Sequence, residues 1–149
     1  MPDRRQIEIY AHAAAPVADV WRWLADARSW STWARFSYSE LEREGVPAPD
    51  GVGAIRRFGS SGVVSREEIL EFDPPHHLAY TLLSGMPVRD YRADVTLTAD
   101  GDGTLITWRS SFFPRYPGTG AALAAFMRFV LTDIATRLAK HSTAASGGA

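Results

Sequence analysis

Hydrophobic and polar residues alternate along much of the chain with a period of two, the spacing typical of β-strands with one buried face. Near the N-terminus, for example, Ile7 and Ile9 alternate with Glu8 and Tyr10. The pattern predicts seven strands, at residues 6–11, 36–42, 53–58, 63–72, 78–84, 88–98 and 104–113. The stretches GVPAPDGVG, GSSG, DPPHH and ADGDG separate several of them and predict turns. Meandering strands joined by such turns pair side by side, so we expect one antiparallel sheet.

Three segments show the helical period of 3.6 instead. Apolar residues at i, i+3, i+4 and i+7 predict a helix over residues 17–24, after Pro16, which suits a helix start. The segment DARSWSTWARF, residues 26–36, predicts a second short helix, and residues 119–140 predict a long third one. We expect that helix to lie across the concave face of the curled sheet, in a single domain of residues 1–149. The small, polar residues 141–149 are expected to form a disordered tail.

Two segments resemble a known superfamily: EEILEFDPPHHLAYTL and PVRDYRADVTLTADGDGTLITWRSSFFP. With the order of elements and the long last helix, they resemble the START-like, or Bet v 1-like (SRPBCC), superfamily, and within it bacterial proteins of the polyketide cyclase/dehydrase or lipid-transport type. The resemblance implies an α+β helix-grip fold, in which a seven-stranded curved antiparallel sheet with two short helices grips a long C-terminal helix. Members bind sterols, lipids, plant hormones or polyketides, and some are enzymes. They share no catalytic motif, so the resemblance carries over no catalytic residue.

The strand at residues 88–98 places an arginine in line with residues that should face inward. Arg89 shares its face with Tyr91, Ala93, Val95 and Leu97. A guanidinium is almost never buried without a partner, so its position needs an explanation. In a helix-grip protein the inner face of the sheet lines a cavity, where such a charge can meet a ligand, a water or an opposite charge.

Two other strands offer charges that could meet there. Arg56 alternates with Ala54 and Phe58, which predicts a second inward arginine. Glu67 and Glu68 point to opposite faces of the next strand, so either register sends one carboxylate inward. We expect that carboxylate to pair with Arg56 or Arg89, and Arg89 to lie near the cavity mouth, because pairing avoids a lone buried charge. The alternative is that both arginines lie at strand ends with their heads in water.

Aromatic residues are frequent, with five Trp, five Tyr and seven Phe in 149 residues. Several fall on predicted inner faces, where they would line either an ordinary core or an apolar ligand chamber. With the charged residues above, they complete the expected ligand-binding set: Arg56, Phe58, Glu67, Tyr80, Arg89, Tyr91, Trp108, Phe112, Phe126, Met127 and Val130.

Composition narrows the function classes. The formal net charge of −1 argues against a nucleic-acid-binding surface. The absence of cysteine excludes disulfides and thiolate chemistry and fits a reducing compartment, so we expect a cytoplasmic protein. No apolar run is long enough to span a bilayer, and the N-terminus lacks the apolar stretch of a signal peptide, so we expect no stable membrane insertion.

Neither a metal nor a cofactor is expected. The four histidines, at positions 12, 76, 77 and 141, do not have the spacing of a metal pair on a helix. The GVG and GDG stretches precede no helix, as a nucleotide-binding loop would.

These observations predict a protein that binds a hydrophobic or amphipathic small molecule, such as a lipid, polyketide or related metabolite, in an internal cavity. An inward arginine favours an acidic oxygen on that molecule. Two alternatives use the same cavity: a polyketide cyclase or dehydratase whose Glu or Tyr moves protons, and a non-catalytic interaction protein with a vestigial pocket. A carboxylate bonded to Arg89 or Tyr91 in a closed pocket would favour the enzyme. A cavity filled by Trp and Phe would favour the interaction protein. The oligomeric state stays open.

Overall fold

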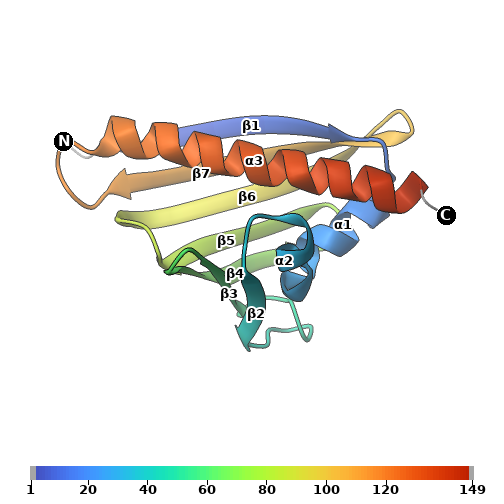
Figure 1. The fold of residues 1–149 in the computed structure, drawn as a ribbon, viewed down its shortest axis with the longest axis horizontal. Coiled ribbons are helices and arrows are strands. Elements are labelled where there is room, and N and C mark those ends of the chain that lie inside the picture. Colours follow the sequence, from blue (N-terminus) through green and yellow to red (C-terminus); the bar gives the residue numbers. More distant parts are fainter. Residues whose placement is uncertain (1–2, 148–149) are drawn as a thin grey trace.

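The computed structural model describes residues 3–147, in which seven strands form one antiparallel sheet of order β1-β7-β6-β5-β4-β3-β2 (Figure 1). The strands are β1 (Arg5–Ala13), β2 (Tyr38–Arg43), β3 (Ile55–Ser60), β4 (Val63–Asp73), β5 (His77–Ser84), β6 (Val88–Asp100) and β7 (Gly103–Pro114). The helices are α1 (Val17–Ala25), the 3-10 helix η1 (Ala27–Ser29), α2 (Trp30–Trp33) and α3 (Gly120–Gly147). The predicted α+β helix-grip fold is therefore confirmed.

The long helix α3 closes one face of the sheet. It packs against β1 and β7 and meets α1 near its C-terminal end (Figure 1). Met127, Leu131, Ile134 and Leu138 form its buried stripe, at the spacing expected for one helix face. Their burial against the sheet is what holds a helix of this length in place, since most helical stability in proteins comes from tertiary packing.

The C-terminal end of α3 differs from the expected disordered tail, because the helix continues to Gly147. Polar side chains of this segment bond to residues at the other end of the chain. The Ala14 N–H donates to Thr143 Oγ1 at 2.9 Å, and Ser146 Oγ donates to Asp19 Oδ2 at 2.9 Å. The composition of the segment does not predict these tertiary hydrogen bonds. The last two residues of the expected tail lie outside the described range.

The inner face of the sheet carries large side chains that are completely buried. Trp108 of β7 and Phe58 of β3 contact Trp30 of α2, and Phe112 of β7 stacks on Tyr91 of β6. All of them belong to one buried cluster with the apolar face of α1. The outer face is polar and exposes charged residues of β1, β4, β6 and β7. Across residues 3–147, no helix combines the length and the apolar character needed to cross a membrane.

A β-bulge near the start of β6 interrupts the alternation that the sequence predicts. The pairing with β7 shifts between Arg89 and Arg92, and Asp90 has a positive φ of 52°. The extra residue turns both Arg89 and Asp90 outward, so Val88 takes the buried position before Tyr91. The predicted inward direction of Arg89 is therefore wrong, whereas that of Tyr91, Ala93, Val95 and Leu97 is confirmed.

Candidate ligand-binding site

A buried ion pair lies between the sheet and its covering helices. Arg56 of β3 and Glu67 of β4 are direct neighbours in the antiparallel register, and Arg56 Nη2 donates to Glu67 Oε1 at 2.5 Å. Arg56 is 0% exposed and Glu67 is 7% exposed. Of the two candidate carboxylates, Glu67 is thus the inward one, while Glu68 is half-exposed and contacts Arg43 at 3.5 Å. The predicted inward arginine and its pairing with a β4 carboxylate are confirmed for Arg56.

Three aromatic rings surround the guanidinium of Arg56. Its Cζ lies 4.7 Å from the ring centroid of Trp30, 5.2 Å from that of Tyr80 and 5.3 Å from that of Phe58. The negative faces of such rings attract a cation, by about 2 kcal/mol when the pair is desolvated. This cradle helps to keep a full charge inside an apolar layer, where, among residues 3–147, one carboxylate forms an ion pair with it.

The same guanidinium retains unused donor capacity. Within residues 3–147, Arg56 Nε and Nη1 are buried and have no hydrogen-bond partner. Leaving a buried polar group unpaired costs about 1–3 kcal/mol, and more for a charged one. An oxygen atom placed against these groups would recover that cost, so they mark the strongest place for a ligand acceptor in the interior.

Two phenols lie beside the ion pair. Trp108 Nε1 donates to Tyr80 Oη at 3.2 Å, and Tyr91 Oη lies 3.9 Å from Met127 Sδ of α3. Burial raises the pKa of both Tyr80 and Tyr91, and the nearby Glu67 carboxylate adds to the shift. Both phenols therefore keep their protons at neutral pH and act as hydrogen-bond donors.

Two opposing effects act on the pKa of the Glu67 carboxyl. Burial raises the pKa of its carboxyl, and the charge and hydrogen bond of Arg56 offset only part of that effect, so the pKa lies above its usual range. The buried carboxyl therefore holds a proton more readily than an exposed glutamate does.

The structure gathers most of the predicted site residues in the interior. Those buried on the inner face of the sheet or on the inner stripe of α3 are Arg56, Phe58, Glu67, Tyr80, Tyr91, Trp108, Phe112 and Met127. Val130 is half-buried and packs against this core. Their location inside the protein follows the predicted alternation, while their contact with a ligand stays a prediction.

Phe126 and Arg89 do not join this set. The side chain of Phe126 is 52% exposed, because it lies about 100° around the helix from Met127 and so falls outside the buried stripe. Arg89 is exposed beyond the bulge, and among residues 3–147 no ion pair joins it to Glu67 or Glu68. The expected place of both residues in the interior is wrong.

Two buried residues of the interior, Trp30 and Ser110, were not among the predicted ligand-binding residues. Trp30 comes from a helix of one turn, where its spacing from Trp33 indicates a buried face but not which strand that face meets. Ser110 falls on the inner face of β7 between Trp108 and Phe112, so alternation does signal its direction. A lone serine on that face is nonetheless an ordinary occurrence, and only the three-dimensional neighbours distinguish it.

Aromatic side chains pack closely beside Arg56. Trp30 stacks on Phe58, with ring centroids 4.7 Å apart, and contacts Trp108 edge-on at 6.1 Å. Two depressions in the described part of the molecule lie elsewhere: one against the outer face of the sheet, and one between β1 and the C-terminal half of α3. A molecule bound at Arg56 would therefore contact or displace the ring of Trp30.

A cluster of metal-ligating side chains lies on the outer face, where Glu71, His77 and Asp94 place one ligand atom each within 4.8 Å of the others. Arg92 already donates to both carboxylates, with Nε 3.0 Å from Asp94 Oδ2, and His77 Nε2 lies 2.7 Å from Asp94 Oδ1. Because a cation already sits between the carboxylates, we assign this cluster to an ion-pair network.

Comparison with known proteins supports the fold and the family. A family model described as polyketide cyclase / dehydrase and lipid transport matches residues 4–143. Comparison of the sequence with curated proteins finds no significant match.

Several solved structures are similar over most of their length. Norcoclaurine synthase from Thalictrum flavum, solved in complex with dopamine and hydroxybenzaldehyde, is 15% identical with a TM-score of 0.70, over 93% of this chain and 86% of that one. Ara h 8.0201 is 13% identical with a TM-score of 0.75, over 94% and 98% of the two chains. A protein from Thermobifida fusca is 25% identical with a TM-score of 0.71, over 91% and 93%.

Proposed function

Because the chain belongs to the polyketide cyclase/dehydrase and lipid transport family, we propose that it binds a hydrophobic or amphipathic small molecule against the inner face of its sheet. We further propose that an acidic oxygen of this molecule bonds to Arg56. The observation that carries the proposal is the fully buried guanidinium of Arg56, two nitrogens of which have no partner among the residues that the structure describes.

The surroundings of Arg56 suit a molecule with an apolar body and one acidic head. A carboxylate, enolate or phenolate oxygen accepts a charge-assisted hydrogen bond, which is about twice as strong as a neutral one. The protonated phenols of Tyr80 and Tyr91 add donors around the same point. The apolar body would contact Phe112, Met127 and the half-buried Val130. A protein of the same fold holds small aromatic molecules, as norcoclaurine synthase does with dopamine and hydroxybenzaldehyde.

Proton transfer to a bound polyketide-like molecule is a second candidate function. It is favoured by one observation, a buried carboxyl at Glu67 whose pKa is raised. Glu67 bonds to Arg56 rather than to Tyr91, however, so the geometry supports binding more directly than catalysis. A cytoplasmic location also remains a proposal, which rests on the absence of cysteine.

Decanoate and its uncharged analogue decanol provide a direct test by isothermal titration calorimetry. We expect the wild type to bind both saturably, and the double variant Arg56→Met/Glu67→Gln to bind decanoate about 10- to 150-fold more weakly. That range corresponds to about 1.5–3 kcal/mol for a hydrogen bond to a charged group. Decanol binding should change little, because the variant removes no apolar surface from the interior.

Arg89→Leu serves as the matched control, since it removes an exposed arginine from the same sheet. It should leave binding of both molecules unchanged. Failure of the wild type to bind either molecule would refute the proposal and favour a packed, non-binding interior. Equal losses for decanoate and decanol in the double variant would show that the pair acts through stability or shape.

A further inference from the structure

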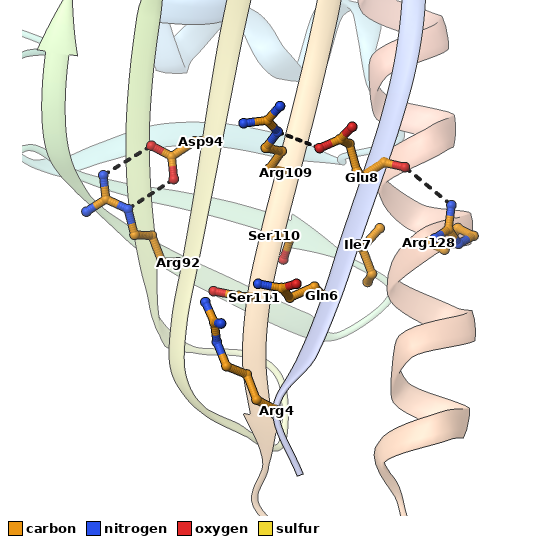
Figure 2. Close-up of a pocket in the computed structure, with 10 residues that line it drawn as sticks. All are labelled: Arg4, Gln6, Ile7, Glu8, Arg92, Asp94, Arg109, Ser110, Ser111 and Arg128. Carbon is orange, nitrogen blue, oxygen red and sulfur yellow. Dashed lines mark hydrogen bonds and ion pairs between the residues drawn. The ribbon is translucent and has the colours of Figure 1, made fainter. Parts of the chain in front are cut away.

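The outer face of the sheet carries a depression of about 670 Å³. Residues of β1, β6, β7 and α3 line it (Figure 2). The strand register explains why it forms. Gln6 of β1, Ser111 of β7 and Arg92 of β6 are cross-strand neighbours in one row, and Glu8, Arg109 and Asp94 make the adjacent row. Ser111 has the smallest side chain of the six, so it forms a floor between longer neighbours.

Three arginines border this floor, and carboxylates neutralise their charges to different degrees. Arg109 Nε lies 2.5 Å from Glu8 Oε2, and Arg92 is paired with Asp94 and Glu71. Arg4, by contrast, has no ion pair among residues 3–147, and its guanidinium extends toward Ser111 (Figure 2). The depression therefore has positive charge that its own carboxylates do not cancel.

A fourth arginine reaches the depression from a different element. Arg128 of α3 extends past the edge of β1 and donates to the backbone oxygen of Glu8 at 3.4 Å (Figure 2). Its charge also has no carboxylate partner within the described range, so the lining holds four arginines against two carboxylates. An exposed ion pair such as Arg109–Glu8 is worth only about 0–1 kcal/mol, so an arriving anion can compete for these guanidinium groups.

We propose that this depression is a second ligand site, which binds a phosphate group at Ser111. A phosphate offers several acceptor oxygens in a tetrahedral arrangement. The lining offers donors from several directions: the guanidinium groups of Arg4, Arg92 and Arg109, the Ser111 hydroxyl and the Gln6 amide. A planar carboxylate would use fewer of them. Ile7 and Ser110 also line the depression, but the proposed phosphate donors alternate with these buried residues and so lie on the face of the sheet opposite to Arg56.

The test uses inorganic phosphate and pyrophosphate, titrated into the labelled protein and followed by the NMR shifts of the Ser111 amide and the arginine Nε–H groups. Ser111→Leu keeps every charge but fills the floor, and we expect it to weaken binding at least tenfold. Arg4→Gln removes the unpaired cation and should weaken binding about three- to tenfold. Thr98→Leu, an exposed change on the same face of β6, should leave binding unchanged.

Several results would overturn the proposal: no saturable shift in the wild type, or equal binding by wild type, Ser111→Leu and Arg4→Gln. Arg4 lies before β1, so Arg4→Gln tests the site even if Ser111→Leu folds poorly.

Co-sedimentation with phosphatidylcholine vesicles, with and without phosphatidic acid, distinguishes the source of the phosphate. Phosphatidic acid-dependent binding that Ser111→Leu abolishes would assign it to a lipid headgroup, and phosphate binding without vesicle binding would assign it to a soluble molecule. Vesicle binding that Ser111→Leu leaves unchanged, with no binding of phosphate, would also overturn the proposal.

Discussion

Removing Arg56 while keeping Glu67 should make stability strongly pH-dependent. In Arg56→Met the buried carboxyl of Glu67 loses the one positive charge that it contacts. An isolated buried carboxylate is so unfavourable that the group will take up a proton and stay neutral in the folded state. In the unfolded chain the same carboxyl ionises with its ordinary pKa of 4.5.

The expected magnitude follows from this difference. Holding a proton at pH 7 on a group whose unfolded pKa is 4.5 costs about 3.4 kcal/mol, at 1.36 kcal/mol per pH unit. The folded variant binds one more proton than the unfolded chain above that pKa, so its stability falls as pH rises. At about pH 5.5 the same cost is about 1.4 kcal/mol.

Urea denaturation of Arg56→Met and of Arg56→Met/Glu67→Gln measures this cost directly, because the second variant replaces the protonated carboxyl by a neutral amide of similar size. We expect the double variant to be more stable by about 3 kcal/mol at neutral pH, with the gap closing as pH falls. A gap below about 1 kcal/mol that does not change with pH would refute the reasoning, since it would mean that Glu67 is hydrated in the folded variant.

Two further predictions concern stability. Phe112→Ala should lower the free energy of unfolding by about 3–5 kcal/mol, because the ring is 1% exposed. The exposed Phe126 is the matched comparison: Phe126→Ala should change the free energy of unfolding by about 0.5 kcal/mol or less. Urea denaturation of the two variants checks both values. Burial acts to raise the pKa of Asp94, but hydrogen bonds from Arg92 and His77 and the Arg92 charge outweigh it, so the pKa lies below its ordinary value of 3.8. The wild type should therefore be more stable than Asp94→Asn above pH 3.8 and lose this advantage as pH falls through the lower pKa of the folded state. Urea midpoints at several acidic pH values measure this difference. A stability advantage that grows toward low pH would contradict the assignment.

The order of strands and helices is readable from the sequence because it depends on local pattern. Period-two alternation in β7 places Ile106, Trp108, Ser110 and Phe112 on one face, and the structure buries all four. The inward direction of Arg56 follows from the same rule. In a regular strand the direction of each side chain is decided by its immediate neighbours, so no distant contact is needed to predict it.

The outward direction of Arg89 could not be predicted in this way. One extra residue in the β6 bulge reverses the alternation, and the bulge is a feature of the pairing between β6 and β7. Phe126 is a similar case on a helix. It continues an apolar pattern, but the width of the buried stripe depends on how α3 sits against β1 and β7.

The chemistry of the two candidate sites depends on tertiary contacts most of all. The sequence by itself determined that an inward arginine and an inward carboxylate would be present, since alternation controls direction. Only the tertiary structure decided that Glu67 meets Arg56, that Trp30 covers the guanidinium, and that Arg128 reaches the depression around Ser111 from α3. Arg56 and Glu67 lie only 11 residues apart, on consecutive strands, but which carboxylate faces Arg56 depends on the strand register. The approach of Trp30 and Arg128 depends on helix packing, which local patterns do not encode.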